Sequence, residues 1–190
     1  AAMRGEGPSP LPAMLEGARF LQGAGATALA IACNTAHHWA DALQMAVKIP
    51  LLHIADAAVA ELVARKPPPA TVGLLGTRET LKAGIYQDRM AAHGISTMEP
   101  DEATQAAIER AIADVKAGEM ERACVEFIPA ASALIERGAD ALVLACTELP
   151  LVPCPADLRP RMLDPTMALA RAIVAHSRGA PCGPAGADVS

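Results

Sequence analysis

Two cysteines stand at matching places in a segment that occurs twice along this chain. The segment GATALAIACNT covers residues 25–35 and GADALVLACTE covers residues 138–148, and six of the eleven positions are identical. Cys33 and Cys146 occupy the same place in the two copies. A thiolate takes a proton from carbon and a thiol gives one back. Two such groups on opposite faces of one carbon would invert it, so the repeat predicts acid–base chemistry by a pair of thiols.

The residues around each cysteine predict where it lies in the fold. Each copy has a short apolar run bounded by a glycine, which is typical of a buried strand, and polar residues after the cysteine, which are typical of a helix start. Ligands gather at the carboxyl ends of strands in open α/β sheets, and N–H groups at a helix start favour an anion. A lone cysteine is more often a small buried hydrophobe. A matched pair favours chemistry on a carboxylate substrate.

Strands and helices are expected to alternate along the chain, which predicts an α/β fold with parallel sheets flanked by helices. We expect strands at residues 27–33, 49–54, 71–75, 95–98 and 140–145, and helices at 10–23, 35–47, 55–65, 77–93, 101–117, 119–137 and 165–176. The last helix follows a closing segment that begins at residue 162.

The repeat predicts two pseudo-symmetric lobes with the active site in a cleft between them. Three prolines at residues 67–69 cannot be helical and mark the boundary. The first lobe is expected at residues 1–66 plus 161–177, and the second lobe at 70–160. Residues 178–190 are rich in Gly, Ala and Pro and are expected to be a disordered tail.

Composition narrows the class of protein. The chain has 190 residues, a net charge of −5 and no basic run, which argues against nucleic-acid and anionic-membrane binding. No segment approaches the roughly 20 apolar residues that cross a bilayer. An odd number of cysteines without paired CxxC spacing argues against a disulfide framework and a zinc knuckle, and they are residues 33, 124, 146, 154 and 182. Reduced thiols indicate a cytoplasmic protein.

Other polar groups carry weaker signals. His37 and His38, with Cys33, are a poor metal set because no further ligand pair follows at helical spacing. The glycines at residues 73–76 lack a phosphate-loop pattern. Glu148 either orients a thiol or stabilises a helix start. The remaining cysteines, at residues 124, 154 and 182, have no repeat partners and are interpreted as bystanders.

Longer motifs resemble a known family. ACNTAH at residues 32–37 and ACTELP at 145–150 resemble the two signatures of the aspartate/glutamate racemase superfamily, most closely its aspartate racemase branch. LGTRET at 75–80 resembles the glycine–threonine turn of the second lobe, and LDPT at 163–166 resembles the C-terminal return segment. The resemblance implies racemisation of a small, preferably dicarboxylic, amino acid without pyridoxal phosphate, metal or other cofactor. We also expect a homodimer.

The resemblance also implies a role for particular residues. Cys33 and Cys146 would be the two acid–base residues, each serving one enantiomer. Lys116, in a Lys-x-Gly context, would bind the distal carboxylate, although a lysine near a helix end is more often a solvated side chain. The residues expected to hold the substrate are Asn34, Thr35, Thr77, Lys116, Thr147 and Glu148.

Several alternatives stay open at this point. The first strand of the family, its glycine-rich turn and an arginine for the distal carboxylate would precede Ala1, and Arg4 does not match that arginine's position. The first lobe is therefore expected to lack its first strand, and an impaired, truncated remnant is one hypothesis. A broad-specificity racemase, a maleate isomerase or decarboxylase relative and a redox-sensing thiol protein are the others.

Overall fold

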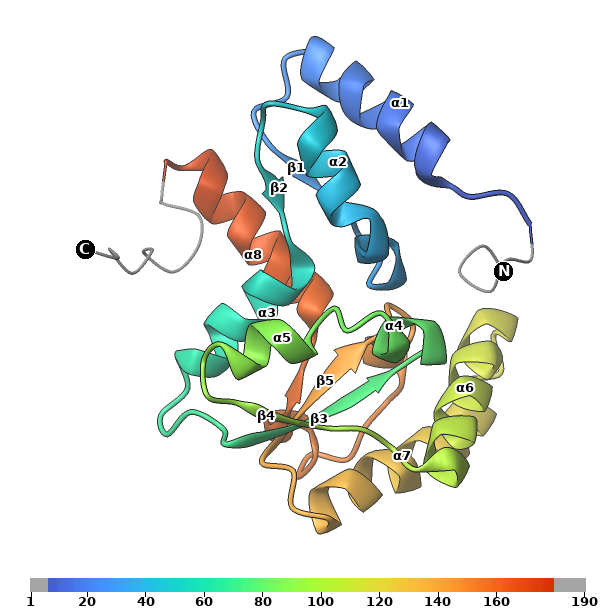
Figure 1. Cartoon of the computed structure of the whole chain (residues 1–190). Helices are drawn as coiled ribbons and strands as arrows, with labels where there is room; N and C mark the ends of the chain where they lie inside the picture. Colours follow the sequence, from blue (N-terminus) through green and yellow to red (C-terminus); the bar gives the residue numbers. More distant parts are fainter. Residues whose placement is uncertain (1–6, 180–190) are drawn as a thin grey trace.

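Two parallel β-sheets with helices around them make up the structure (Figure 1). The computed structural model describes residues 7–179. The predicted α/β class, with parallel sheets flanked by helices, is confirmed. Residues 180–190, which hold most of the predicted disordered tail, lie outside the described residues.

The smaller sheet lies in the N-terminal part of the chain and has two short strands. Leu29 pairs with Leu51, and side chains of Ala18, Leu43 and Val47 complete a small core around Leu29. The elements of this part are α1 (Leu11–Gly23), β1 (Leu29–Ala30), η2 (Thr35–Trp39), α2 (Ala40–Ala46) and β2 (Leu51–Leu52).

The larger sheet has four parallel strands in the order β4-β3-β5-β6. These strands are β3 (Thr71–Gly76), β4 (Ser96–Met98), β5 (Ala141–Ala145) and β6 (Met162–Leu163). Strand β5 pairs on both sides and consists only of buried apolar residues, as expected for a central parallel strand covered on both faces. The sheet therefore provides the rigid part of the fold.

Alternate residues of β5 point to two different helix layers, because successive side chains of a strand lie on opposite faces. Ala141, Val143 and Ala145 pack in one core with α3 (Ile54–Val63) and α5 (Gln87–Ala91). Residues 142 and 144, and Cys146 after them, pack in a second core with α6 (Glu102–Ala117) and α7 (Met120–Glu136). The register thus directs Cys146 toward the α6–α7 layer.

Helix α8 (Pro165–Ser177) connects the two parts of the fold. Leu169 of this helix packs in one buried cluster with Leu52 of β2 and Ile54 of α3. Arg171 pairs with Glu61 of α3, with an N–O distance of 2.8 Å. Figure 1 shows α8 running beside α3 and toward β2. The remaining elements are α4 (Arg78–Lys82), η3 (Leu149–Leu151) and η4 (Arg159–Arg161).

The packing bears on the predicted division into lobes at residues 1–66 plus 161–177 and 70–160. Helix α3 packs on the four-stranded sheet, and β6 pairs with β5 of the same sheet. These contacts argue for assigning α3 and β6 to the second unit. The lobe boundaries remain a prediction. No helix among residues 7–179 has the length and apolarity that a bilayer crossing requires.

Four predicted elements differ from the observed ones. The strand expected at 49–54 is limited to β2, Leu51–Leu52. The strand expected at 27–33 is shorter, because β1 has a single pairing partner and covers Leu29–Ala30. The helix expected at 35–47 begins as a 3₁₀ turn, with a bond from the N–H of His37 to the carbonyl of Asn34. The helix expected at 77–93 is divided into α4 and α5, since Gly84 has a φ of +66° and ends α4.

Gly76→Ala is expected to destabilise the fold by about 1–3 kcal/mol, a typical cost of overpacking a close contact. A Cβ at this position would lie 2.9 Å from the carbonyl oxygen of Ala145, on the paired strand β5. The matched control is Gly17→Ala on α1, where a Cβ meets nothing within 4 Å. We expect the control to be neutral or stabilising. Chemical denaturation measures both, and equal effects would contradict the close-approach argument.

Candidate active site

Both cysteines follow parallel strands, but their surroundings differ. Cys146 comes directly after β5 and is 8% exposed, whereas Cys33 comes three residues after β1 and is exposed. Strand β5 is enclosed by its neighbours on both sides, and β1 pairs with β2 alone. The same local pattern therefore gives one buried thiol and one thiol that solvent reaches.

Threonine side chains bring the two cysteine loops to one edge of the larger sheet. Gly76 of β3 pairs with Ala145 of β5, so Thr77 and Cys146 leave neighbouring strands side by side. Thr35, two residues after Cys33, has its Oγ1 2.7 Å from the Oγ1 of Thr80 and 3.4 Å from that of Thr77. In Figure 1 the start of the η2–α2 segment lies close to α4.

The thiol of Cys146 donates a hydrogen bond to a carboxylate. Its Sγ lies 2.9 Å from Oε2 of Glu148, and the Thr147 hydroxyl donates to the same oxygen at 3.1 Å. Burial, together with the hydrogen bond to Glu148, raises the pKa of the Cys146 thiol to about 12. Thus Cys146 is a protonated thiol near neutral pH, which suits a proton donor.

Glu148 is held as the anion in this arrangement. Burial opposes its ionisation, but the Cys146 thiol, the Lys116 ammonium and the Thr147 hydroxyl together leave the pKa of Glu148 lowered. Nζ of Lys116 lies 3.5 Å from Oε1 of Glu148, and the lysine side chain is 59% exposed. The structure therefore brings Lys116, Thr147 and Glu148 together around Cys146.

His37 fixes the loop that carries Cys33. Its Nδ1 lies 2.8 Å from the carbonyl oxygen of Cys33, and the N–H of Ile54 donates to its Nε2 at 3.1 Å. Because Nε2 accepts, Nδ1 carries the proton and donates. Burial lowers the pKa of His37, so the ring is neutral. His37 is engaged on both nitrogens, and residues 7–179 contain no group of three metal-type ligands.

A second buried histidine packs against the first. The rings of His37 and His53 are 4.4 Å apart and T-shaped, and Nδ1 of His53 accepts from the N–H of Ala55 at the start of α3. Burial and the neighbouring ring lower the pKa of His53 to about 3. Sequence analysis missed His53, and missed the structural role of His37, because no local spacing connects the two.

Asn34 is the most buried of the predicted substrate-binding residues, with 2% exposure. Its Oδ1 accepts a hydrogen bond from the hydroxyl of Tyr86. Its Nδ2 has no partner among residues 7–179. Thr80 and Tyr86 were also missed. Thr80 had a usable signal, since it stands three residues after Thr77, the spacing of a helix cap, and its N–H donates to the Thr77 hydroxyl.

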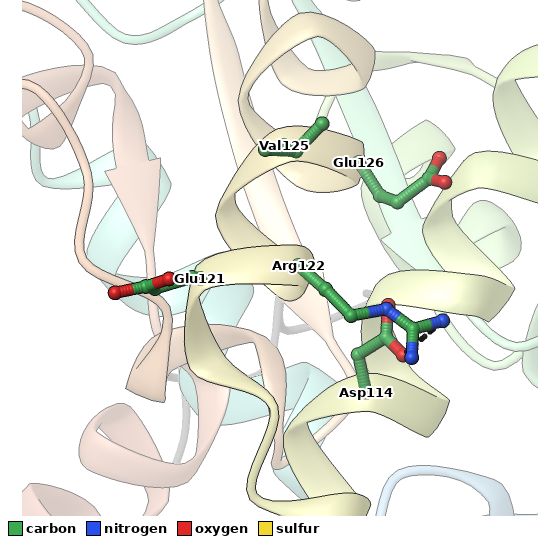
Figure 2. Close-up of a pocket in the computed structure, with 5 residues that line it drawn as sticks. All are labelled: Asp114, Glu121, Arg122, Val125 and Glu126. Carbon is green, nitrogen blue, oxygen red and sulfur yellow. Dashed lines mark ion pairs between the residues drawn. The ribbon is translucent and has the colours of Figure 1, made fainter.

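The pocket drawn in Figure 2 is separate from the cysteine edge of the sheet. It has a volume of about 380 Å³, lies on α6 and α7, and is lined by Asp114, Glu121, Arg122, Val125 and Glu126. An ion pair between Arg122 and Asp114 crosses it at 3.4 Å. It contains none of the predicted site residues. The cysteine edge of the sheet, with its buried thiol and unpaired amide, remains the candidate active site.

Comparison with known proteins decides the family. Residues 2–173 match the Asp/Glu/hydantoin racemase family. The chain belongs to this family. The superfamily predicted from the two cysteine motifs is thereby confirmed.

The members of the family that this chain is similar to include several racemases. The broad specificity amino-acid racemase RacX of Bacillus subtilis is 30% identical over 138 residues, which cover 72% of this chain and 59% of RacX. The glutamate racemase of Persephonella marina is 30% identical over 141 residues, covering 73% of this chain and 52% of the enzyme. The chain thus spans somewhat more than half the length of these curated relatives.

Solved structures of the family share the fold. The aspartate racemase of Picrophilus torridus is 30% identical with a TM-score of 0.75, covering 93% of this chain and 72% of the enzyme. A putative Asp/Glu racemase from Yersinia pestis is 29% identical with a TM-score of 0.78, covering 88% of this chain and 73% of that protein. The α/β architecture with parallel sheets is therefore that of a racemase family member.

Lowering the pH from about 7 to about 5 is expected to reduce the free energy of unfolding. The unfolded chain protonates its histidines near about pH 6.5, whereas the folded pKa values of His37 and His53 lie lower. Below pH 6.5 the unfolded state therefore binds more protons. His53, with a folded pKa of about 3, contributes a loss that approaches about 1.4 kcal/mol per pH unit, and His37 adds to it in the same direction. Urea denaturation across this range measures the slope.

His53→Asn is the matched variant for that slope. Asparagine still accepts from the N–H of Ala55 as a helix cap but does not titrate. We expect the histidine-dependent slope to fall by at least about half, because His53 has the large shift. Equal slopes in the two proteins would contradict the assignment of His53.

Proposed function

We propose that this chain carries the two-thiol site of a cofactor-independent amino-acid racemase, with aspartate or glutamate as the preferred substrate. One observation supports this above all. Cys33 and Cys146 follow parallel strands whose exits are joined through Thr35, Thr77 and Thr80. Inverting a carbon requires one group on each side of it, and these loops supply one thiol each.

The mechanism assigns opposite protonation states to the two thiols. Cys33, as the thiolate, takes the α-proton of one enantiomer. Cys146, as the thiol, gives its proton to the opposite face of the same carbon. The inverted amino acid leaves, with Cys33 protonated and Cys146 anionic. The other enantiomer, or solvent, returns both groups to their starting states, so every proton is accounted for without a cofactor.

The proposed substrate contacts match the charges of an amino acid. The amide N–H groups of Asn34 would donate to the α-carboxylate. The hydroxyls of Thr35, Thr77 and Thr147 can donate or accept, and they would hold the α-carboxylate and ammonium groups. The ammonium group of the exposed Lys116 lies beside Glu148, which contacts Cys146. It would pair with a distal carboxylate of the substrate. Glu148 would orient the Cys146 thiol. Since both thiols must be reduced to work, we also propose a cytoplasmic location.

A broad-specificity racemase is the second candidate. The similarity to RacX at 30% identity favours it. The two candidates differ at Lys116, because a distal-carboxylate contact matters only for acidic side chains. A panel of substrates separates them: an acidic-specific enzyme prefers aspartate and glutamate strongly over alanine.

The deciding experiment incubates the protein with single L-amino acids in deuterated water, after dialysis against a chelator. Chiral chromatography measures the D-enantiomer, and mass spectrometry measures α-deuterium. A racemase gives both together for its substrate. Absence of both across the panel would overturn the proposed function, and activity restored only by added metal or pyridoxal phosphate would overturn the two-thiol mechanism.

Cys33→Ala and Cys146→Ala are each expected to reduce racemisation by at least about a hundredfold, because each removes the acid or the base of one step. The variant that lacks Cys146 should still exchange the α-proton of one enantiomer without inverting it. Cys124→Ala, at a half-buried thiol of α7, is the control and should keep the parent rate. A near-parent rate in either active-site variant would contradict the mechanism.

Glu148→Gln is expected to lower the pKa of Cys146 from about 12, because the variant removes the anion beside the thiol and leaves its burial unchanged. Alkylation of Cys146, followed by mass spectrometry across pH, should accelerate at lower pH than in the parent. Glu126→Gln, which removes a carboxylate that pairs with Arg110, is the control. Identical alkylation profiles for the parent and Glu148→Gln would show that Glu148 does not set the acidity of the thiol.

A further inference from the structure

A single tyrosine connects the core of the larger sheet to the candidate active site. Tyr86 is the one tyrosine of the chain, is 1% exposed, and precedes α5 in the core that also holds Leu81 and Met90. The ring of Tyr86 is enough to pack among these apolar side chains, so packing alone does not explain its hydroxyl. A hydroxyl is costly to bury unless it is hydrogen-bonded, and this one donates to Oδ1 of Asn34.

The contact determines what Asn34 offers to a ligand. An amide has one oxygen acceptor and one NH₂ group with two donors. The Tyr86 hydroxyl donates to this oxygen, so the two N–H donors of Nδ2 are the groups that lack a partner. Nδ2 of Asn34 is buried and has no partner among residues 7–179, although a buried unpaired donor is a cost that folded proteins avoid. The unpaired donor therefore indicates a place for an acceptor that is not part of this chain.

The opposite amide orientation would give a different site. If the amide were rotated by half a turn, Nδ2 would donate to the tyrosine oxygen and Oδ1 would face the ligand. An acceptor oxygen would then oppose a carboxylate. A phenol can donate or accept, but the Tyr86 hydroxyl donates to Oδ1 here and leaves Nδ2 without a partner among residues 7–179. Burial raises the pKa of Tyr86 well above its ordinary value, so the phenol keeps the proton that it donates.

The backbone around Tyr86 is fixed independently of its hydroxyl. The N–H of Tyr86 donates to Oε1 of Gln87 at 3.3 Å, and Nε2 of Gln87 donates to the carbonyl of Leu81 at 2.9 Å. Removal of the hydroxyl alone should therefore leave the turn and the ring in place. The tyrosine hydroxyl is thus a separable element of the structure.

We propose that Tyr86 is a positioning residue that holds the amide of Asn34 with both N–H groups directed at the carboxylate of the amino-acid ligand. The inference rests on the proposed function, because it takes the ligand to be an amino acid bound beside Cys33. It adds to that function a residue from the core of the larger sheet. Tyr86 lies 52 positions after Asn34 and determines which end of the amide faces the ligand.

Tyr86→Phe tests the proposal, because it keeps the ring and removes the hydroxyl. We expect the dissociation constant for the best amino acid of the isotope panel, measured by calorimetry, to rise about tenfold to a hundredfold, the range for a hydrogen bond to a charged group. KM should rise alike, with kcat changed much less. The variant should also lose the preference for that amino acid over its α-carboxamide, a loss that a merely structural role would not cause.

Phe127→Leu is the matched control, since Phe127 is fully buried in the α7 core and does not contact Asn34 through any hydrogen bond. It should lower stability without changing the preference for the carboxylate. In an Asn34→Ala background, Tyr86→Phe should have no further effect on affinity, because the two residues act through one contact. Independent, additive losses would overturn the proposal.

A spectroscopic measurement keeps the test available if Tyr86→Phe does not fold. The near-ultraviolet difference spectrum of the parent on ligand addition should contain a tyrosine signal, and Asn34→Ala should abolish it. A parent that binds and racemises the ligand, with a Tyr86→Phe variant that binds equally well, would overturn this inference alone. A parent that neither binds nor racemises any amino acid of the panel would overturn the proposed function and this inference with it.

Discussion

The hydroxyls of Thr35 and Thr80, 2.7 Å apart, join the loop after β1 to the helix after β3. The two sheets have separate apolar cores and no strand pairing between them, so another contact must set their relative placement at this edge. Leu52, Ile54 and Leu169 link the sheets by apolar burial, which is non-directional. The hydroxyl contact is directional, as are the hydrogen bonds from Tyr86 to Asn34 and from Ile54 to His37. Together these contacts fix where the Cys33 loop lies against the larger sheet.

Similar sequence around two cysteines does not give them similar surroundings. The strand–cysteine–polar pattern recurs because it depends on local sequence. The burial and the contacts of each thiol depend on neighbours outside the repeated segment, and these differ between the two copies. Cys146 follows the central strand of a covered sheet and contacts Glu148, whereas Cys33 follows a strand of two residues and is exposed. In the proposed mechanism, this difference is what separates the proton donor Cys146 from the solvent-exposed Cys33.

Sequence patterns predicted the parts of the fold that depend on local apolar periodicity. Strand β5 and helices α6 and α7 were predicted within one or two residues, because long apolar or amphipathic segments leave few alternatives. The division between α4 and α5 was missed, since it depends on the conformation of a single glycine, Gly84.

The site was predictable to the extent that its residues adjoin the cysteines in sequence. Thr147 and Glu148 follow Cys146 directly, and Lys116 was expected from the family resemblance alone. The contact of Tyr86 with Asn34 spans 52 positions, and the bond from Ile54 to His37 spans 17. Neither distance corresponds to a period of a helix or strand, so only the folded chain brings these groups together.

The threonine cluster would also limit how a substrate anion binds at the proposed site. Thr35, Thr77 and Thr80 place three hydroxyls within 2.7–3.4 Å of one another, and three hydroxyls carry three hydrogens. A closed ring uses all three internally, one for each contact. An arriving anion must draw at least one hydrogen outward, which leaves two hydrogens for three contacts and opens the ring. Under the proposed function, binding of the substrate would thus loosen the contact between the Cys33 loop and the start of α4.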